Sequence, residues 1–319
     1  MNRRLILILT LGLAACAPPP APPLRLGTFV AWPGYAPLYL AQELGFYKDT
    51  NVRLVDFSSA TQLLRAFRNG AVDAATLTLD EALLLNSQGH NPHIVLVLDI
   101  SHGADAILGR RGLKTLADLR GKRVGVEVSA LGALMLARGL ESAGLTLEDV
   151  TVVPVPADEF VMAYTTGQVD AIVCYEPHMS KLLAQGAVKL FDSTAIPGEI
   201  FDVMLAREDV LKNQLGKELV KLVNSWFQAL EYLRTQPDDA YVRIGKRLHL
   251  SVADTRTAFQ GLTLVDYREN LRYLTGERPA LLAPATYLYK IMQDRNLIDN
   301  PVNLKTIIFP DILIDLNDK

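Results

Sequence analysis

The sequence has few of the residues that build metal centres, disulfide frameworks or nucleic-acid interfaces. Its 319 residues include two cysteines and five histidines, with no Cys-x-x-Cys motif, and the histidines are dispersed along the chain. A zinc site is therefore not expected, and no cofactor is expected. The formal net charge is −3 and no stripe of Lys and Arg stands out, which argues against a nucleic-acid partner.

Long apolar runs are also scarce, and the one at the amino terminus predicts export. Arg3 and Arg4 precede an apolar stretch from Leu5 to Ala15. A membrane-spanning helix needs roughly 20 apolar residues, so this stretch is too short to be one. A basic start followed by a short apolar core is typical of a secretory signal. Residues 1–15 are therefore expected to be a signal peptide, and no other stretch is long and apolar enough to cross a membrane.

The residues after this run are expected to anchor the protein. The stretch LAAC, which ends at Cys16, resembles the bacterial lipobox, and this implies cleavage before Cys16 and a lipid on that cysteine. The alternative is a plain signal peptide with an incidental cysteine. Residues 16–23 continue as a Pro-rich tether, which is extended and cannot be helical. The protein is thus expected in the periplasm, lipid-anchored to a bacterial membrane. Lipidation of Cys16 leaves Cys174 alone, so no internal disulfide can form.

An internal repeat predicts two similar α/β lobes. The stretch GAVDA at residues 70–74 returns as GQVDA at residues 167–171. Around both copies, short apolar strands alternate with helices, and the spacing from Gly27 to Asp73 nearly equals that from Gly125 to Asp170. Strands that alternate with helices of this length predict βαβ units and a parallel sheet in each half.

The chain after residue 200 departs from the repeat. It begins with one more expected strand, IFDVMLARE, and continues with helices expected over residues 216–234, 238–248, 251–260 and 279–293. These helices are expected to pack on the first lobe, which would comprise residues 24–103 and 200–319, with residues 104–199 forming the second lobe. The chain would cross between the lobes near 102–111 and near 193–202, and two crossings permit a hinge.

Five segments along the chain resemble one family when taken together. They are LAAC, YLAQELGFYKDTNVRLV, FRNGAVDAATL, GLKTLADLRGKRVGV and TTGQVDAIVCYEP. This set is similar to the periplasmic substrate-binding lipoproteins of ABC importers in the nitrate, sulfonate, taurine and thiamin-pyrimidine precursor group, the SsuA/NMT1-like group. The match covers roughly residues 24–210. The resemblance implies an α/β, two-lobed type II periplasmic binding protein fold with a hinge. It also implies delivery of a small-molecule ligand to an ABC permease with its ATPase.

The ligand is expected beyond the carboxyl ends of the parallel strands, where open α/β sheets bind ligands. The loops there carry aromatic rings, hydroxyls and carboxylates, and no Arg or Lys. Trp32 and Tyr35 stand on the first loop beside Pro33 and Gly34, so a ring there either contacts the ligand or packs under the loop. The candidate ligand-binding residues are Trp32, Tyr35, Ser59, Thr78, Asp80, Ser129, Tyr175, Glu176 and Asp202.

Several candidates have structural alternatives. Ser129 precedes a helix, where it either favours an anion or serves as an N-cap. Asp80 and Glu176 would face each other across a closed cleft and hold an amine or an N–H-rich ring. Asp80 could instead cap the helix that begins near Glu81, and Glu176 could bind the backbone of its own loop. Asp202, near the second crossing, could look into the cleft.

These residue types favour a cationic or neutral nitrogen compound, such as an amine or a pyrimidine-like ring. Unpaired buried carboxylates beside a bare anion would be costly. The alternatives are an anion such as a sulfonate or nitrate, held at helix N-termini, and a ligand sensor that docks on a membrane signalling receptor. An enzyme is not expected, because the related yeast thiamin-pyrimidine synthase depends on a Cys-rich iron motif that this chain lacks. A monomer is expected.

Overall fold

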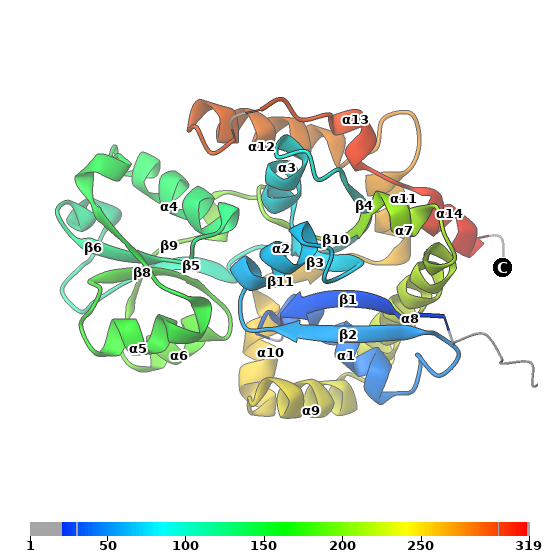
Figure 1. Ribbon diagram of the computed structural model, residues 1–319. Helices are drawn as coiled ribbons and strands as arrows, with labels where there is room; N and C mark the ends of the chain where they lie inside the picture. The colour runs from blue at the N-terminus through cyan, green and yellow to red at the C-terminus, as the bar shows by residue number, and fades with distance from the viewer. Residues whose placement is uncertain (1–20, 30, 299, 318–319) are drawn as a thin grey trace, which may run out of the picture.

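The computed structural model describes residues 21–29, 31–298 and 300–317. The expected signal peptide at residues 1–15 and the expected lipidation site at Cys16 lie outside this part of the chain. Two lobes lie side by side, each built on one sheet with helices packed around it (Figure 1). No helix within the described ranges combines the length and apolar character that a membrane span requires.

The first sheet has six strands in the order β11-β4-β10-β3-β1-β2. Its strands are β1 (Leu24–Phe29), β2 (Val52–Phe57), β3 (Ala74–Thr78), β4 (Pro92–Ser101), β10 (Phe201–Arg207) and β11 (Leu262–Leu264). The connecting helices are η1 (Pro33–Tyr35), α1 (Ala36–Glu43), α2 (Ala60–Arg68) and α3 (Leu79–Ser87). β1 pairs in parallel with β2 and β3, whereas β10 runs antiparallel between β3 and β4.

The second sheet has five strands in the order β7-β6-β8-β5-β9. Its strands are β5 (Asp105–Gly109), β6 (Arg123–Val126), β7 (Thr151–Pro154), β8 (Ala171–Tyr175) and β9 (Val188–Asp192). Its helices are η2 (Leu116–Leu119), α4 (Ala130–Ser142), η3 (Leu147–Asp149), η4 (Ala157–Glu159), α5 (Phe160–Thr165), α6 (His178–Ala184) and η5 (Ser193–Ala195). β6 pairs in parallel with β7 and β8, and β5 is antiparallel to β8. The expected parallel pairing therefore holds for the three repeated strands of each lobe, and the remaining strands join antiparallel.

The repeated pentapeptide has the same structural role in both lobes. In the first lobe, the Arg25 guanidinium donates to Asp73 at 2.7 and 2.9 Å, and the Arg25 backbone N–H donates to the same carboxylate at 2.8 Å. In the second lobe, Arg123 repeats this arrangement with Asp170 at 2.8, 3.1 and 3.0 Å. Each arginine also donates to the carbonyl of the repeat glycine. The repeat thus encodes a bidentate ion pair that ties β1 to the residue just before β3 in the first lobe, and β6 to the residue just before β8 in the second.

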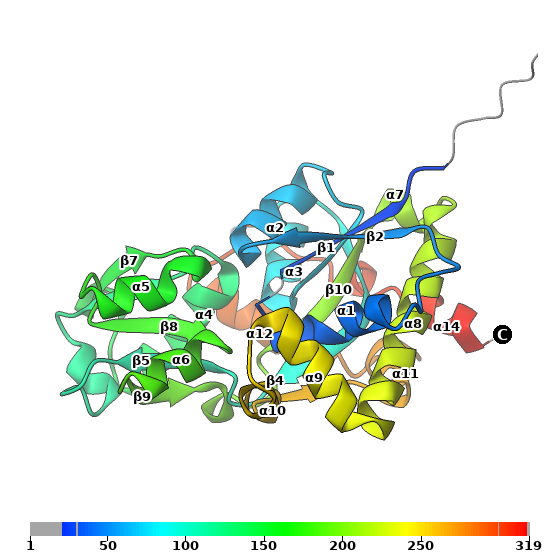
Figure 2. The same cartoon turned by 90° about the horizontal axis from the view of Figure 1, so that it is seen from below.

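The C-terminal helices pack on the first lobe, as the sequence predicts. They are α7 (Glu208–Leu211), α8 (Leu215–Thr235), α9 (Pro237–Leu248), α10 (Val252–Gln260), α11 (Tyr267–Leu274), α12 (Leu282–Asp294), α13 (Leu304–Ile307) and α14 (Asp311–Asn317). α8 and α9 run beside α1 (Figure 2). Trp226 of α8 is fully buried, and Asn270 of α11 exchanges hydrogen bonds with the backbone of Val97 in β4 at 2.8 and 2.9 Å. The sequence pattern predicts no helix at α11, which is only eight residues long.

Two short passages join the lobes. The chain leaves the first sheet after Ser101 and returns to it at Phe201, so the passages comprise residues 102–104 and 193–200. They lie against each other, because the Ser193 hydroxyl is 2.9 Å from the Ser101 hydroxyl and accepts from the Gly103 N–H at 2.6 Å. Any rotation of one lobe against the other must therefore bend both passages together.

Candidate functional site

A cavity lies between the lobes, at the edge of each sheet where the parallel strands end. Because β5 and β10 run antiparallel to those strands, their first residues reach the same edge. This is where open α/β sheets bind ligands. The cavity is lined by Phe29, Trp32, Tyr35, Ala60, Thr78, Glu81, Asp105, Glu127, Ser129, Leu131, Gly132, Met135, Phe160, Val173, Cys174, Tyr175 and Asp202.

The loop after β1 places two aromatic rings on the cavity, and their polar atoms bind two buried carboxyl groups. Trp32 and Tyr35 are 3% and 0% exposed. The Trp32 indole N–H donates to Asp99 at 3.2 Å, and the Tyr35 hydroxyl donates to Asp202. Asp99 and Asp202 are direct neighbours across β4 and β10. Both residues therefore line the cavity and hold buried carboxyl groups through their polar atoms.

Gly34 makes this loop possible. A Cβ atom at Gly34 would lie 2.0 Å from Asp99 Oδ2 and 2.4 Å from Trp32 Nε1. Both contacts are far shorter than van der Waals separation, so any larger residue would break the Trp32–Asp99 hydrogen bond. The glycine in the WPGY stretch is thus required by close approach of a buried carboxylate.

Gly34→Ala is expected to lower the free energy of unfolding by about 1–3 kcal/mol, the usual range for forcing one extra methyl into a packed site. The reason is the clash with Asp99 and Trp32, neither of which can move freely within the core. Equilibrium denaturation by urea, followed by far-UV circular dichroism, measures the change. A midpoint equal to that of the wild type would show that this loop tolerates a methyl group.

The walls of the cavity carry buried carboxyl groups from both lobes. Glu81 and Asp202 belong to the first lobe, and Asp105 and Glu127 belong to the second. Burial raises the pKa of Asp105 to about 7. Burial likewise raises the pKa of Glu81, with Asp80 adding to the effect, and that of Asp202, with Asp99 adding to the effect. The site is therefore strongly biased toward holding positive charge or protons.

Four polar atoms on the cavity wall are buried without a hydrogen-bond partner among the described residues. They are Thr78 Oγ1, Glu81 Oε1, Asp105 Oδ2 and the Tyr175 hydroxyl. Two come from each lobe. Buried polar groups are normally paired, because an unpaired one costs about 1–3 kcal/mol. Such a cluster on one cavity is typical of a site that receives its partners from a ligand.

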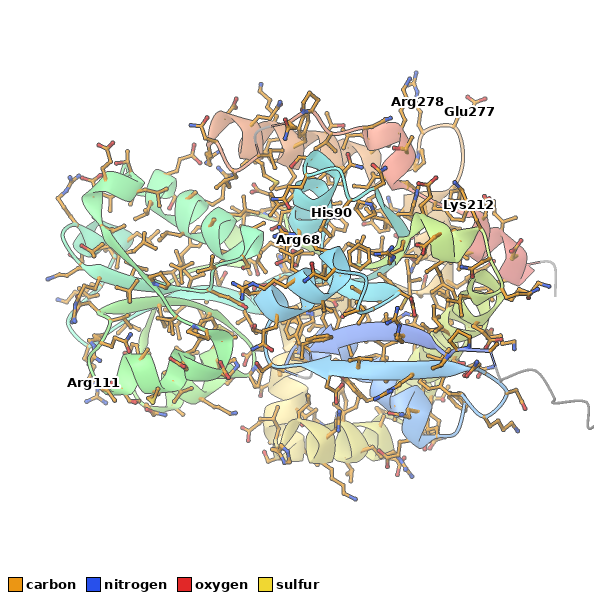
Figure 3. All side chains as sticks on the ribbon, in the orientation of Figure 1. Arg68, His90, Arg111, Lys212, Glu277 and Arg278 are labelled. Carbon is orange, nitrogen blue, oxygen red and sulfur yellow. The ribbon has the colours of Figure 1, made fainter. Side chains whose placement is uncertain are left out.

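No lysine or arginine stands among the cavity-lining residues in the described part of the chain. Figure 3 shows the labelled charged side chains Arg111, Lys212, Glu277 and Arg278 at the periphery of the molecule, and all four are exposed. Across residues 21–29, 31–298 and 300–317, no group of three or more His, Cys, Asp or Glu side chains is arranged to hold a metal ion. The negative character of the cavity is therefore not neutralised by the described protein groups that surround it.

The structure brings six of the nine candidate residues to the cavity. These are Trp32, Tyr35, Thr78, Ser129, Tyr175 and Asp202. Ser129 lines the cavity, and its hydroxyl accepts from the Gly132 N–H at 3.1 Å as the N-cap of α4, which is the structural role that the sequence allows; its role toward an anion stays a prediction. Whether these six contact a ligand stays a prediction.

The other three candidates lie outside the cavity lining. Ser59 is the N-cap of α2 and accepts from the Gln62 N–H at 3.2 Å. Glu176 accepts from the Ser180 hydroxyl at 2.8 Å, so it binds within its own loop and α6 instead of facing the first lobe. Asp80 is fully buried and does not reach the cavity, where Glu81 stands instead. Neighbouring residues at a helix start point in directions about 100° apart, and α3 begins at Leu79.

Sequence reasoning missed several residues that line the cavity. Glu127 directly follows β6, so its place at the carboxyl end of a parallel strand was a usable signal. Asp105 begins β5, a strand in the stretch that was expected to be a crossing, and nothing local marks it as part of the site. Phe29 and Phe160 add aromatic surface from the end of β1 and the start of α5.

Comparison with protein families gives one match that covers most of the chain. Residues 17–243 match the model of the NMT1-like family. A protein of Brucella abortus (strain 2308) that is named as a binding protein is 26% identical over 81% of this chain and 82% of its own length. A protein of Escherichia coli (strain K12) named for binding aliphatic sulfonates is 25% identical over 64% of each chain. A protein of Haemophilus influenzae named for thiamine biosynthesis is 27% identical over 66% of this chain and 68% of its own.

Solved structures confirm the expected two-lobed binding-protein fold. The alkanesulfonate-binding protein SsuA from Xanthomonas axonopodis pv. citri, bound to MOPS, superposes with a TM-score of 0.76 at 20% identity, covering 91% of this chain and 100% of that one. The ligand-binding component of an ABC-type import system from Staphylococcus aureus gives a TM-score of 0.75 at 14% identity, covering 93% and 99%. The desulfurization enzyme DSZB gives 0.67 at 19% identity, covering 92% and 99%. The same fold thus serves binding proteins and at least one enzyme.

Proposed function

The chain belongs to the NMT1-like family, and from this membership we propose that it is the extracytoplasmic substrate-binding component of an ABC importer. It captures a small nitrogen-containing molecule between its lobes and delivers it to a permease and its ATPase. It works as a monomer in the periplasm, held to the membrane by a lipid on Cys16. Proteins with this fold that are named as ABC importer components or as periplasmic binding proteins support the transport role.

The observation that carries the ligand class is the set of buried, unpartnered polar atoms on an acidic cavity. Glu81 Oε1 and Asp105 Oδ2 are acceptors on opposite lobes, and Thr78 and Tyr175 add one hydroxyl each. A ligand that donates several N–H groups, such as a primary amine or an aminopyrimidine, satisfies these atoms. Because the acceptors come from both lobes, each N–H bond made to them favours the closed arrangement over an open one.

The aromatic side chains suit a flat ligand. Tyr175 lies with its ring centroid 6.0 Å from that of Trp32 and 5.7 Å from that of Phe160. These rings come from both lobes and leave apolar faces and edges on the cavity. An apolar wall with a few placed polar groups is the usual construction of a small-molecule site. A heteroaromatic ring that carries an amino group would use both features.

An anion such as a sulfonate or nitrate is the alternative ligand class. The relatives named for sulfonate binding favour it, and the start of α4, with Ser129 and Gly132, lines the cavity. Against it stand the buried carboxyls of Glu81, Asp105 and Asp202, which repel a negative ligand wherever they are ionised. A role as a ligand sensor that docks on a signalling receptor would use the same site.

A binding role fits the site better than catalysis. Cys174 is the only cysteine in the described ranges, and it lines the cavity. Burial raises the pKa of its thiol well above the usual value, and the nearby carboxyls of Glu176 and Asp105 raise it further. A thiol that is held protonated in this way is a poor nucleophile.

A ligand panel tests the proposed class. Protein purified without denaturation is mixed with primary amines, aminopyrimidines, sulfonates or nitrate, and its melting temperature is measured. We expect an amine or aminopyrimidine at a hundred times its Kd to raise the melting temperature by about 5 °C, since such a ligand adds about 2.7 kcal/mol of stability. Stabilisation by sulfonates or nitrate alone would overturn the proposed ligand class and support the alternative.

A further inference from the structure

Glu127 connects the two lobes beside the cavity. It directly follows β6 in the second lobe, and its carboxylate reaches the amino terminus of α2 in the first. Glu127 Oε1 accepts from the backbone N–H of Thr61 at 3.2 Å and lies 3.1 Å from the Thr61 hydroxyl. The same hydroxyl is 2.9 Å from the carbonyl oxygen of Val128. Thr61 of the first lobe thus contacts both the Glu127 carboxylate and the Val128 carbonyl of the second lobe, beside the cavity.

The amino terminus of a helix attracts anions, because its first N–H groups have no partner within the helix and the helix dipole is positive there. α2 is nine residues long and begins at Ala60, which lines the cavity. Ser59 accepts the N–H of Gln62, and Glu127 accepts the N–H of Thr61. The place where the first lobe would hold an oxygen of an anionic ligand is therefore filled by a carboxylate of the protein itself.

Glu127 stands between two environments: the cavity on one side and, on the other, a groove that it lines together with Arg65 and Arg68 of α2. Its side chain is buried, and burial raises its pKa while the hydrogen bonds from Thr61 lower it. No Lys or Arg is found among the described residues that line the cavity with it. The N–H and the hydroxyl of Thr61 favour the ionised form of Glu127, as does the nearby Tyr175 hydroxyl, and separation of the lobes would remove the contribution of Thr61.

We propose that Glu127 determines the charge of the ligand. Its carboxylate occupies the positive end of α2 and excludes sulfonate and nitrate from that position. The same contact holds the second lobe against the first and so acts as a latch between them. The inference deepens the proposed function and rests on it, since it takes the cavity as the ligand site. It assigns to Glu127 the exclusion of anions from the start of α2, in addition to the repulsion of anions by the other carboxyls on the cavity.

The test uses two changes at Glu127 and one matched control. Glu127→Gln removes the charge with little change of shape, and Glu127→Ala also empties the end of α2. Glu148→Ala removes an equal charge from an exposed position of the same lobe. Methanesulfonate and nitrate are titrated into each protein, and binding is measured by isothermal calorimetry and by the shift in melting temperature.

We expect methanesulfonate to bind Glu127→Ala at least tenfold more tightly than it binds the wild type or Glu148→Ala. Glu127→Gln should show a smaller gain, because the amide still occupies the helix end. The proposal would be overturned if neither Glu127 variant binds the anions more tightly than the wild type does, whether or not the wild type binds them. Unfolding transitions like that of the wild type would show that both variants are folded in this comparison.

Two further readouts separate this proposal from the proposed function. The amine and aminopyrimidine panel is repeated on the same proteins, and small-angle scattering compares their radii of gyration. If no amine stabilises the wild type while Glu127→Ala gains anion binding, the proposed ligand class fails and the role of Glu127 stands. If amines bind but the Glu127 variants neither gain anion binding nor expand, the ligand class stands and the latch is wrong.

Discussion

Glu81→Gln is expected to lower the affinity for an amine or aminopyrimidine ligand by about a hundredfold. Glu81 Oε1 faces the cavity without a partner, while Oε2 accepts from the Thr78 N–H at 3.3 Å. Removing one partner of a buried, charged hydrogen bond costs about 2–5 kcal/mol, and 1.4 kcal/mol is a factor of ten in Kd. Isothermal calorimetry with the compound that most stabilises the wild type measures the loss.

Glu176→Gln is the matched control for this experiment. It makes the same chemical change on a buried glutamate of the second lobe that bonds Ser180 and lies outside the cavity lining. We expect its Kd to stay within about twofold of the wild-type value, since no ligand contact is removed. Equal losses in the two variants would mean that the acidic residues act through general charge and that Glu81 has no specific contact.

The second large effect concerns pH. The free protein is expected to lose stability as the pH rises from about 4 to about 7, the reverse of the usual behaviour of paired carboxylates. Burial raises the pKa of Asp105 from 3.8 to about 7, so within this window the folded state keeps a proton that the unfolded state has released. By linkage, stability then falls by about 1.4 kcal/mol per pH unit, about 4 kcal/mol in all. The raised pKa values of Asp99, Asp202 and Glu81 act in the same direction.

Urea denaturation across this pH range measures the effect, with Asp105→Asn as the control. The variant should show a flatter profile and exceed the wild type most clearly near pH 8, because its amide needs no proton. Below about pH 4, wild type and variant should both weaken as Asp170 is protonated, since Arg123 holds the pKa of Asp170 below its usual value. A wild-type stability that rises steadily from pH 5 to pH 8 would contradict the acidic character assigned to the cavity.

The two experiments are connected through the ligand. A cationic ligand replaces the proton on Glu81 or Asp105, so its binding should release protons and should strengthen as the pH rises toward 8. A neutral aminopyrimidine would release fewer protons. Calorimetry in buffers of different ionisation enthalpy distinguishes the two cases, and it would identify the charge of the bound form directly.

The sequence by itself determined the two-lobed α/β architecture, because the signals for it are local. Apolar strands alternate with helices of regular length, and the repeat that contains Asp73 and Asp170 marks equivalent strands in the two lobes. The carboxyl ends of those strands follow directly from the pattern. For the same reason Trp32 and Thr78, which stand just after β1 and at the end of β3, could be placed at the cavity.

Of the acidic groups that face the cavity, the sequence predicts Asp202, and only the tertiary structure decided the others. One residue of helix rotation sends Glu81 to the cavity and leaves Asp80 behind it, and no sequence pattern fixes that angle. Asp105 and Asp202 arrive on strands that run against the repeat. Glu127 accepts a hydrogen bond from Thr61, which is 66 residues away along the chain. Glu176 instead accepts one from Ser180, only four residues away. A carboxylate either forms hydrogen bonds within its own loop or stays available to a ligand. Which of the two occurs depends on contacts that form only when both folded lobes pack together.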